Sequence, residues 1–127
     1  MLNPKIIIVI ATFLLALAVA AGAFGAHALK NTLSPERLET WQTAVQYHAW
    51  HALGLLLIAL IGTQFQIVIT WPASFILAGI LIFSGSLYVL CLTGIGWLGA
   101  ITPIGGIAFI AGWIILGVQM LKIISNP

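Results

Sequence analysis

Four long apolar stretches, separated by short segments that are polar or contain proline, make up most of the chain. The first runs from Ile6 to Ala26, and a helix of that length crosses a hydrocarbon core of ~30 Å at ~1.5 Å per residue. The pattern predicts an all-α fold, a four-helix transmembrane bundle with both termini on one side of the membrane. The expected helices cover about residues 6–28, 35–62, 72–93 and 103–122, and a hydrophilic loop covers 30–40.

Cap residues and prolines indicate where the last three helices begin. Ser34 suits an N-cap position, and Pro35 suits the first helical position, where its missing N–H has no intrahelical partner to lose. Pro72 lies early in the third stretch, and Thr102 with Pro103 repeats the combination of cap and proline before the fourth. We therefore expect the fourth helix to begin at Pro103.

A cleaved signal peptide is the alternative for the first stretch, because Ala26-His27-Ala28 has the small-x-small spacing of a cleavage site. The stretch is longer than the roughly 7–15 residues of a signal-peptide core, and Lys5 alone is a weak positively charged start. We therefore expect a helix that is retained.

Small residues mark one face of this first helix. Ala16, Ala20 and Ala23 share that face with His27 at helical spacing. Small side chains let helices approach each other closely in lipid. We expect the face to point at the other helices and to bring His27 with it.

The composition indicates that lipid surrounds the chain. Apolar residues make up 62% of it and charged residues 5%, against about 25% charged residues in a soluble domain. From Thr40 to Leu121 there is no Lys, Arg, Asp or Glu, and a soluble protein would expose large apolar patches over such a length. We expect a single transmembrane domain, residues 1–127, in a multi-pass protein of the cell (inner) membrane.

Membrane lipid is the first expected partner, and a homo-oligomer or a larger membrane complex is the second. The few cations are scattered along the chain instead of forming the clustered basic face of a nucleic-acid reader, so a nucleic-acid partner is not expected. Their positions are Lys5, Lys30, Arg37 and Lys122. Cys91 is the one cysteine, which leaves no internal disulfide and no paired-cysteine zinc site.

The segment from Trp41 to His51, WQTAVQYHAWH, has the densest polar and aromatic chemistry of the chain. At 100° per residue, one arc of about 100° holds Ala44, Tyr47, His48 and His51, continued or bordered by Gly54, Leu55, Ile58 and Gly62. Gln42, Gln46 and Trp50 fall on roughly the opposite side. Histidine is costly against lipid, so we expect the histidine stripe to face the bundle and the glutamine stripe to stay at headgroup level.

Other polar residues converge on the membrane half that carries the 30–40 loop, which we call the loop side. Ser84, Tyr88 and Cys91 share a face of the third helix at spacings i, i+4 and i+7, and Thr102 opens the fourth helix on the same side. His27 ends the first helix there. Most of the unusual polar chemistry is thus expected in one half of the membrane.

This convergence allows several kinds of site. His27, Tyr47, His48, His51 and Tyr88 are the candidate cofactor-binding residues, as a polar cluster that faces the bundle. Within that set His27, His48 and His51 could hold a metal ion or a haem, and a histidine or tyrosine donor could bind a quinone. The simpler alternative is that each ring hydrogen-bonds another helix and fixes the packing, with no cofactor expected.

Catalysis is not expected. The chain has no Asp, its only acidic residues are Glu36 and Glu39 beside the loop, and no Ser or Cys has an evident base. A proton-coupled exporter would be expected to bury a carboxylate in the bilayer, although histidine can relay protons, so a small permeation pathway remains a third hypothesis. The leading hypothesis is a non-enzymatic structural or accessory component of the membrane. The second is a ligand-binding or redox-accessory protein that uses the histidines.

Four segments carry a resemblance that covers nearly the whole chain. They are GAFGAHAL (residues 22–29), WQTAVQYHAWHAL (41–53), FSGSLYVLCLTG (83–94) and GAITPIGGIAFIAGW (99–113). Together and in this order they resemble the YgdD/YwdK-like family of small membrane proteins. The resemblance implies an integral inner-membrane protein of about four helices with no established biochemical function. It supplies no catalytic residues.

Overall fold

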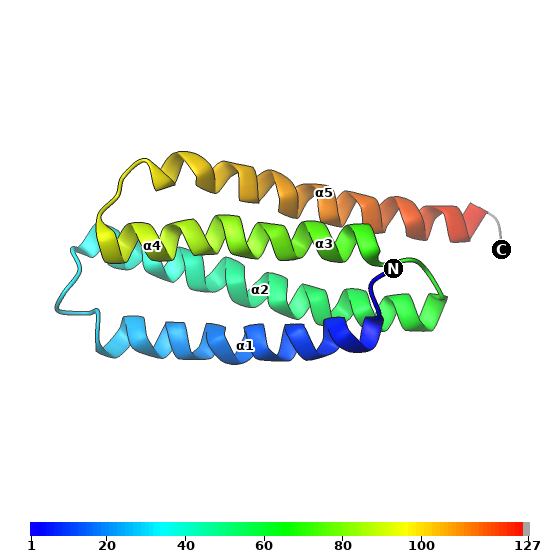
Figure 1. Cartoon of the computed structure of the whole chain (residues 1–127), viewed down its shortest axis with the longest axis horizontal. Coiled ribbons are helices and arrows are strands. Elements are labelled where there is room, and N and C mark those ends of the chain that lie inside the picture. The colour runs from blue at the N-terminus through cyan, green and yellow to red at the C-terminus, as the bar shows by residue number, and fades with distance from the viewer. Residues whose placement is uncertain (126–127) are drawn as a thin grey trace.

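The computed structural model of the chain describes residues 1–125, which form helices and no strand. Helix α1 covers Pro4–His27 and helix α2 covers Pro35–Phe65. The third membrane span is continuous from Thr70 to Thr93 but changes type along its length: α3 is Thr70–Gly79, the π-helix η1 is Ile80–Ser84, and α4 is Gly85–Thr93. Helix α5 covers Leu98–Ser125. All four spans are long and apolar enough to cross a membrane, which confirms the four-helix transmembrane bundle (Figure 1).

The helices pack in chain order. Helix α1 lies against α2, α2 lies against the third span, and the third span lies against α5. Figure 1 shows α1 and α5 at the two outer edges, with the N-terminus and the end of α5 at the same end of the bundle. The opposite end carries the loop after α1 and the turn before α5, so it is the loop side.

The predicted start of α2 is confirmed. The side chain of Ser34 accepts a hydrogen bond from the backbone N–H of Arg37 at 3.3 Å, and Pro35 is the first helical residue. Helix α3 begins at Thr70, slightly before Pro72.

The predicted start of the fourth helix is wrong. Helix α5 begins at Leu98, and Pro103 lies inside it. The first turn forms from backbone hydrogen bonds of Leu98, Gly99 and Ala100 to carbonyl oxygens three residues earlier. Thr102 is buried and its hydroxyl makes a hydrogen bond with the Ser86 hydroxyl at 2.7 Å instead of capping the helix. As the sixth residue of α5, Pro103 lies beyond the first four positions whose N–H groups have no intrahelical partner, so it removes one backbone hydrogen bond from this part of the helix.

The π-helical turn η1 brings two helices together at a glycine. In α5, a Cβ at Gly105 would overlap the backbone nitrogen and Cα of Phe83, whereas one at Gly106 would meet only the Phe83 ring at 3.8 Å. Glycine at 105 therefore lets the α5 backbone lie directly on η1. Helical periodicity alone did not predict this wide turn.

The buried face of α1 differs from the predicted one. Ile7, Ala11, Ala18 and Gly25 are buried, whereas the predicted face, which consists of Ala16, Ala20, Ala23 and His27, is exposed. The reason is that α1 packs mainly on one neighbour, α2. On that side the bulky Trp41 of α2 needs a residue without a Cβ, which is Gly25.

Candidate functional site

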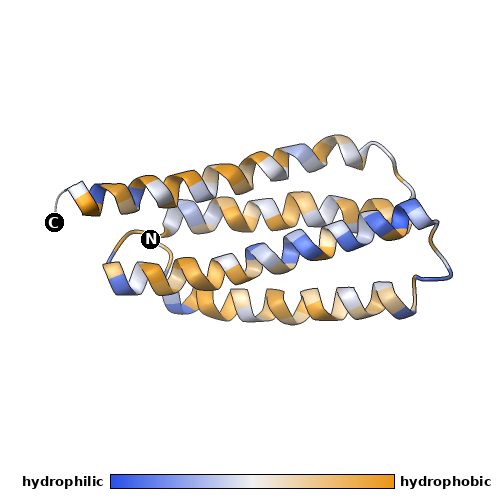
Figure 2. Ribbon diagram, turned by 180° about the vertical axis from the view of Figure 1, so that it is seen from behind, coloured by the Kyte–Doolittle hydropathy of each residue, from blue (hydrophilic) through white to orange (hydrophobic). Residues whose placement is uncertain are grey.

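The two stripes predicted for the loop-side half of α2 are both present. Ala44, His48 and His51 are buried, and Tyr47 is half-buried. The residues that continue the stripe are also buried: Gly54, Leu55, Ile58 and Gly62. Gln42, Gln46 and Trp50 are exposed. Figure 2 shows the hydrophilic residues of α2 concentrated towards the loop side. The burial pattern expected from the helical wheel is confirmed.

Trp41 connects α2 to both of its neighbours, a role that the helical wheel missed. Its indole Nε1–H donates a hydrogen bond to the Ala21 carbonyl oxygen of α1 at 2.9 Å. Its ring lies 4.7 Å from the Tyr88 ring of α4, measured between centroids. Trp41 is 5% exposed, so it acts as a core residue. Gly25 of α1, one turn from Ala21, was the signal that could have found this contact.

His48 is hydrogen-bonded to the third span. Its Nδ1 atom and the Tyr88 hydroxyl are 2.9 Å apart. Nε2 is buried without a hydrogen-bond partner among the described residues, and the backbone of Leu14 in α1 lies near the ring.

His51 belongs to a different interface. Its Nδ1–H donates to the Tyr47 carbonyl oxygen of the preceding turn at 2.8 Å, which assigns the Nδ1–H tautomer because a carbonyl can only accept. The ring stacks on Phe109 of α5 with centroids 3.5 Å apart and planes 17° apart. His51 therefore faces α5, whereas His48 faces α1 and α4.

The structure does not bring the three predicted metal-binding histidines together. His27 is exposed at the end of α1, and His48 and His51 contact different helices. Within residues 1–125 no group of three His, Cys, Asp or Glu side chains is placed to hold a metal ion. Of the predicted cofactor-binding residues, His48 is joined with Tyr88, and Tyr47 stacks with His51 at 5.9 Å.

Each residue of the stripe predicted on the third span, which consists of Ser84, Tyr88 and Cys91, forms a hydrogen bond with α2. The Ser84 hydroxyl donates to the Ala44 carbonyl oxygen at 2.8 Å, and the Cys91 thiol donates to the Arg37 carbonyl oxygen at 3.3 Å. Tyr88 lies between them on His48. With the Trp41 bond to α1, these contacts form a set that we call the polar clamp: Trp41, His48, Ser84, Tyr88 and Cys91. Chemically the clamp consists of hydrogen bonds between helices, which are stabilising in lipid.

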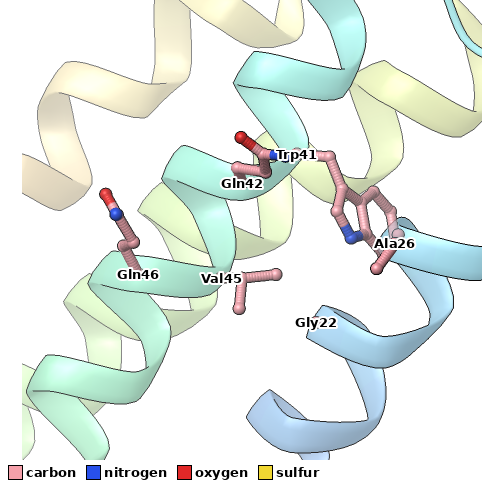
Figure 3. A pocket seen from close by; sticks show the side chains of 7 residues that line it. Gly22, Ala26, Trp41, Gln42, Val45 and Gln46 are labelled. Atoms are coloured by element: carbon pink, nitrogen blue, oxygen red, sulfur yellow. The ribbon is translucent and has the colours of Figure 1, made fainter. Parts of the chain in front are cut away.

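A groove of about 230 Å³ opens at the surface between α1 and α2, on the loop side. Its lining consists of Gly22, Gly25, Ala26, Trp41, Gln42, Val45 and Gln46. Figure 3 shows the Trp41 ring beside Ala26, and the two glutamine side chains on α2 along the other side. Because Trp41 Nε1 is already bonded to Ala21, the free polar groups that the lining side chains offer are the amides of Gln42 and Gln46. The groove can therefore bind a neighbour through amide hydrogen bonds and apolar contact.

Comparison with known proteins assigns the family. Residues 21–106 match the family model described as "Protein of unknown function (DUF423)". The chain is 42% identical to the UPF0382 membrane protein SH2409 of Staphylococcus haemolyticus, over 95% of this chain and 99% of that one. It is 44% identical to the UPF0382 membrane protein YwdK of Bacillus subtilis, over 93% and 98%. No solved structure matches. The expected resemblance is confirmed: the chain is a membrane protein that belongs to the DUF423 family and is related to YwdK.

Proposed function

We propose that this protein is a non-enzymatic structural or accessory component of the cell (inner) membrane, and that it acts by packing sideways against other membrane proteins. The relatives are membrane proteins by name, and the family model is described as a protein of unknown function. The proposal therefore depends on how this chain uses its own polar groups.

The observation that carries the proposal is the polar clamp. Two polar groups that could serve a catalytic or redox site are instead hydrogen-bonded between helices: His48 Nδ1 with Tyr88 at 2.9 Å, and Ser84 to Ala44 at 2.8 Å. A pair of the same kind joins Ser86 to Thr102 at 2.7 Å. Side chains held in this way stabilise one arrangement of the bundle.

The outer surfaces support lateral association. Helices α1 and α5 are the least buried spans. Helix α1 packs mainly on α2, and α5 packs mainly on the third span. The exposed glutamine stripe of α2 borders a groove, and glutamine side chains hydrogen-bond across helices in membranes. A protein with this surface can join a larger assembly without a domain outside the membrane.

Native mass spectrometry of the protein taken from its own membrane in mild detergent tests the proposal, because it reports partners, stoichiometry and bound ligands together. The expected result is a reproducible complex, either with copies of the same chain or with another membrane protein. A monomer without a reproducible partner across several detergents would contradict the proposal.

A second function, the binding of a small ligand, is favoured by one atom. His48 Nε2 is buried and lacks a hydrogen-bond partner among the described residues, and such a group can donate to an acceptor such as a quinone carbonyl. Metal analysis and an absorption spectrum of the purified protein test this alternative. Bound ligand that disappears in the His48→Ala/His51→Ala double variant would support it. A ligand-free protein would end it.

A further inference from the structure

We infer that the groove between α1 and α2 is a docking site for a second copy of this chain, with the Gln42 and Gln46 amides of one copy hydrogen-bonded to those of the other. This inference rests on the proposed function and names the partner. It depends on three properties of the groove, which are the depth of its amides, their chemistry, and the shape of its walls.

The amides lie near or within the hydrocarbon layer. Gly22 lies level with Val45, since a Cβ at Gly22 would meet the Val45 Cγ1 atom at 3.5 Å. The apolar run of α1 ends at Ala26, about 6 Å closer to the loop side at 1.5 Å per residue. Gln46 is one residue deeper than Val45 and exposed. An amide at that depth gains more from a protein partner than from lipid tails, which offer no hydrogen bonds.

The chemistry of the amides favours an identical partner. Two copies with the same membrane orientation are related by a two-fold axis along the membrane normal, so each residue meets its own counterpart at the same depth. A primary amide carries both donors and acceptors and can pair with itself. An anionic lipid headgroup would instead need a cation, and the residues that line the groove include none.

The walls of the groove leave room for a neighbouring helix. On the α1 side the groove is lined by Gly22 and Ala26, which have little or no side chain. Small residues of this kind let a neighbouring helix approach closely. The volume of about 230 Å³ exceeds the ~150 Å³ cavity that holds a benzene molecule. One bulky side chain of the second copy therefore fits.

Disulfide cross-linking in native membranes tests the location. In a Cys91→Ala background, Gln46→Cys should form a disulfide-linked dimer on mild oxidation. The control is Ile107→Cys on α5, where the Ile107 side chain is 67% exposed. Ile107 lies at a similar depth to Gln46: Gly105 of α5 contacts Phe83, and the adjacent Ser84 bonds to Ala44 of α2. Ile107 and Gln46 each lie two residues deeper than these contacts. A dimer with Gln46→Cys and little with Ile107→Cys supports the inference. Equal cross-linking, or none at Gln46, overturns it.

Dimer affinity in liposomes tests the amides themselves. The Gln42→Leu/Gln46→Leu double variant should dimerise about tenfold more weakly, the loss expected for a few interhelical hydrogen bonds in a membrane. Gln64→Leu is the matched control, since Gln64 is an exposed glutamine at the far end of the same helix and its loss should leave affinity unchanged. If the double variant dimerises as strongly as the wild type, the inference is overturned. That is the result expected when the amides are hydrogen-bonded only to water at the headgroup level.

Failure of this inference can be told apart from failure of the proposed function. If native mass spectrometry finds a complex with another protein and no copies of this chain, the second copy is wrong and the accessory function stands. If phospholipid copurifies with the wild type and is lost from the double variant, while the protein stays monomeric, lipid is the occupant and the inference is overturned. A monomer without any partner contradicts both.

Discussion

The indole Nε1 of Trp41 donates a hydrogen bond to the carbonyl oxygen of Ala21, and this 2.9 Å contact joins the first two helices. The side chain fits because Gly25, one turn further along α1, has no Cβ. An added Cβ would lie 2.5 Å from Trp41 Cδ1. The same ring packs against the tilted ring of Tyr88, with centroids 4.7 Å apart, so one residue links three membrane spans. This link is the central part of the polar clamp.

The close fit of Gly25 to Trp41 predicts an unequal response of neighbouring glycines. Gly25→Ala should destabilise the bundle by about 1–3 kcal/mol, the usual cost of overpacking a core. Gly22→Ala is the control, because its Cβ would meet Val45 at an ordinary 3.5 Å. Unfolding of both variants in detergent, followed by circular dichroism, measures the difference. Equal stability of the two variants would show that the indole can move aside.

The Trp41 hydrogen bond can be separated from the Trp41 packing. Trp41→Phe removes the N–H and keeps an aromatic ring, so it should cost about 1 kcal/mol, within the range measured for hydrogen bonds between membrane helices. Trp41→Ala also leaves a cavity and should cost about 3–5 kcal/mol. The free energy of unfolding of the two variants is the measurement. A phenylalanine variant as unstable as the alanine variant would contradict this division.

The bond between His48 and Tyr88 predicts energetic coupling. A double-mutant cycle with His48→Phe and Tyr88→Phe should give a coupling energy of about 0.6–1.7 kcal/mol. A second cycle with His27→Phe and Tyr88→Phe is the control and should give none, because His27 is exposed at the end of α1. Stability measurements in detergent provide both values. No coupling between His48 and Tyr88 would remove this bond from the clamp.

The π-helical turn predicts a sharp contrast between two adjacent glycines of α5. Gly105→Ala places a Cβ on the backbone of Phe83, which cannot rotate away, whereas Gly106→Ala meets only the edge of a ring at 3.8 Å. The first change should cost about 1–3 kcal/mol. The second should lie within about 0.5 kcal/mol of the wild type. Thermal unfolding of the two proteins side by side measures the contrast, and similar midpoints would argue against direct backbone contact.

The sequence was sufficient for the fold and for the burial of α2, because both follow from periodic apolar patterning. Ala44, His48 and His51 are buried and Gln42 and Gln46 are exposed, as a helical wheel predicts. A wheel gives the direction of a side chain but not which neighbouring helix it meets. For this reason it grouped His48 with His51, although one faces Tyr88 and the other Phe109.

Three features depended on tertiary contacts that local patterns do not encode. Pro103 lies inside α5 because Thr102 bonds to Ser86 across the bundle and does not cap the helix. Helix α1 buries Gly25 instead of the alanine face because Trp41 occupies that side. The π turn η1 accompanies the approach of α5 to the third span at Gly105. Each feature depends on a partner residue far away in the sequence.

The most direct test of this account is the mass of the complex that the protein forms in its own membrane. Native mass spectrometry should find copies of the chain together, or the chain with another protein, and no additional mass from a metal ion, haem or quinone. A monomer that carries a small ligand, with the ligand lost in the His48→Ala/His51→Ala variant, would contradict the account.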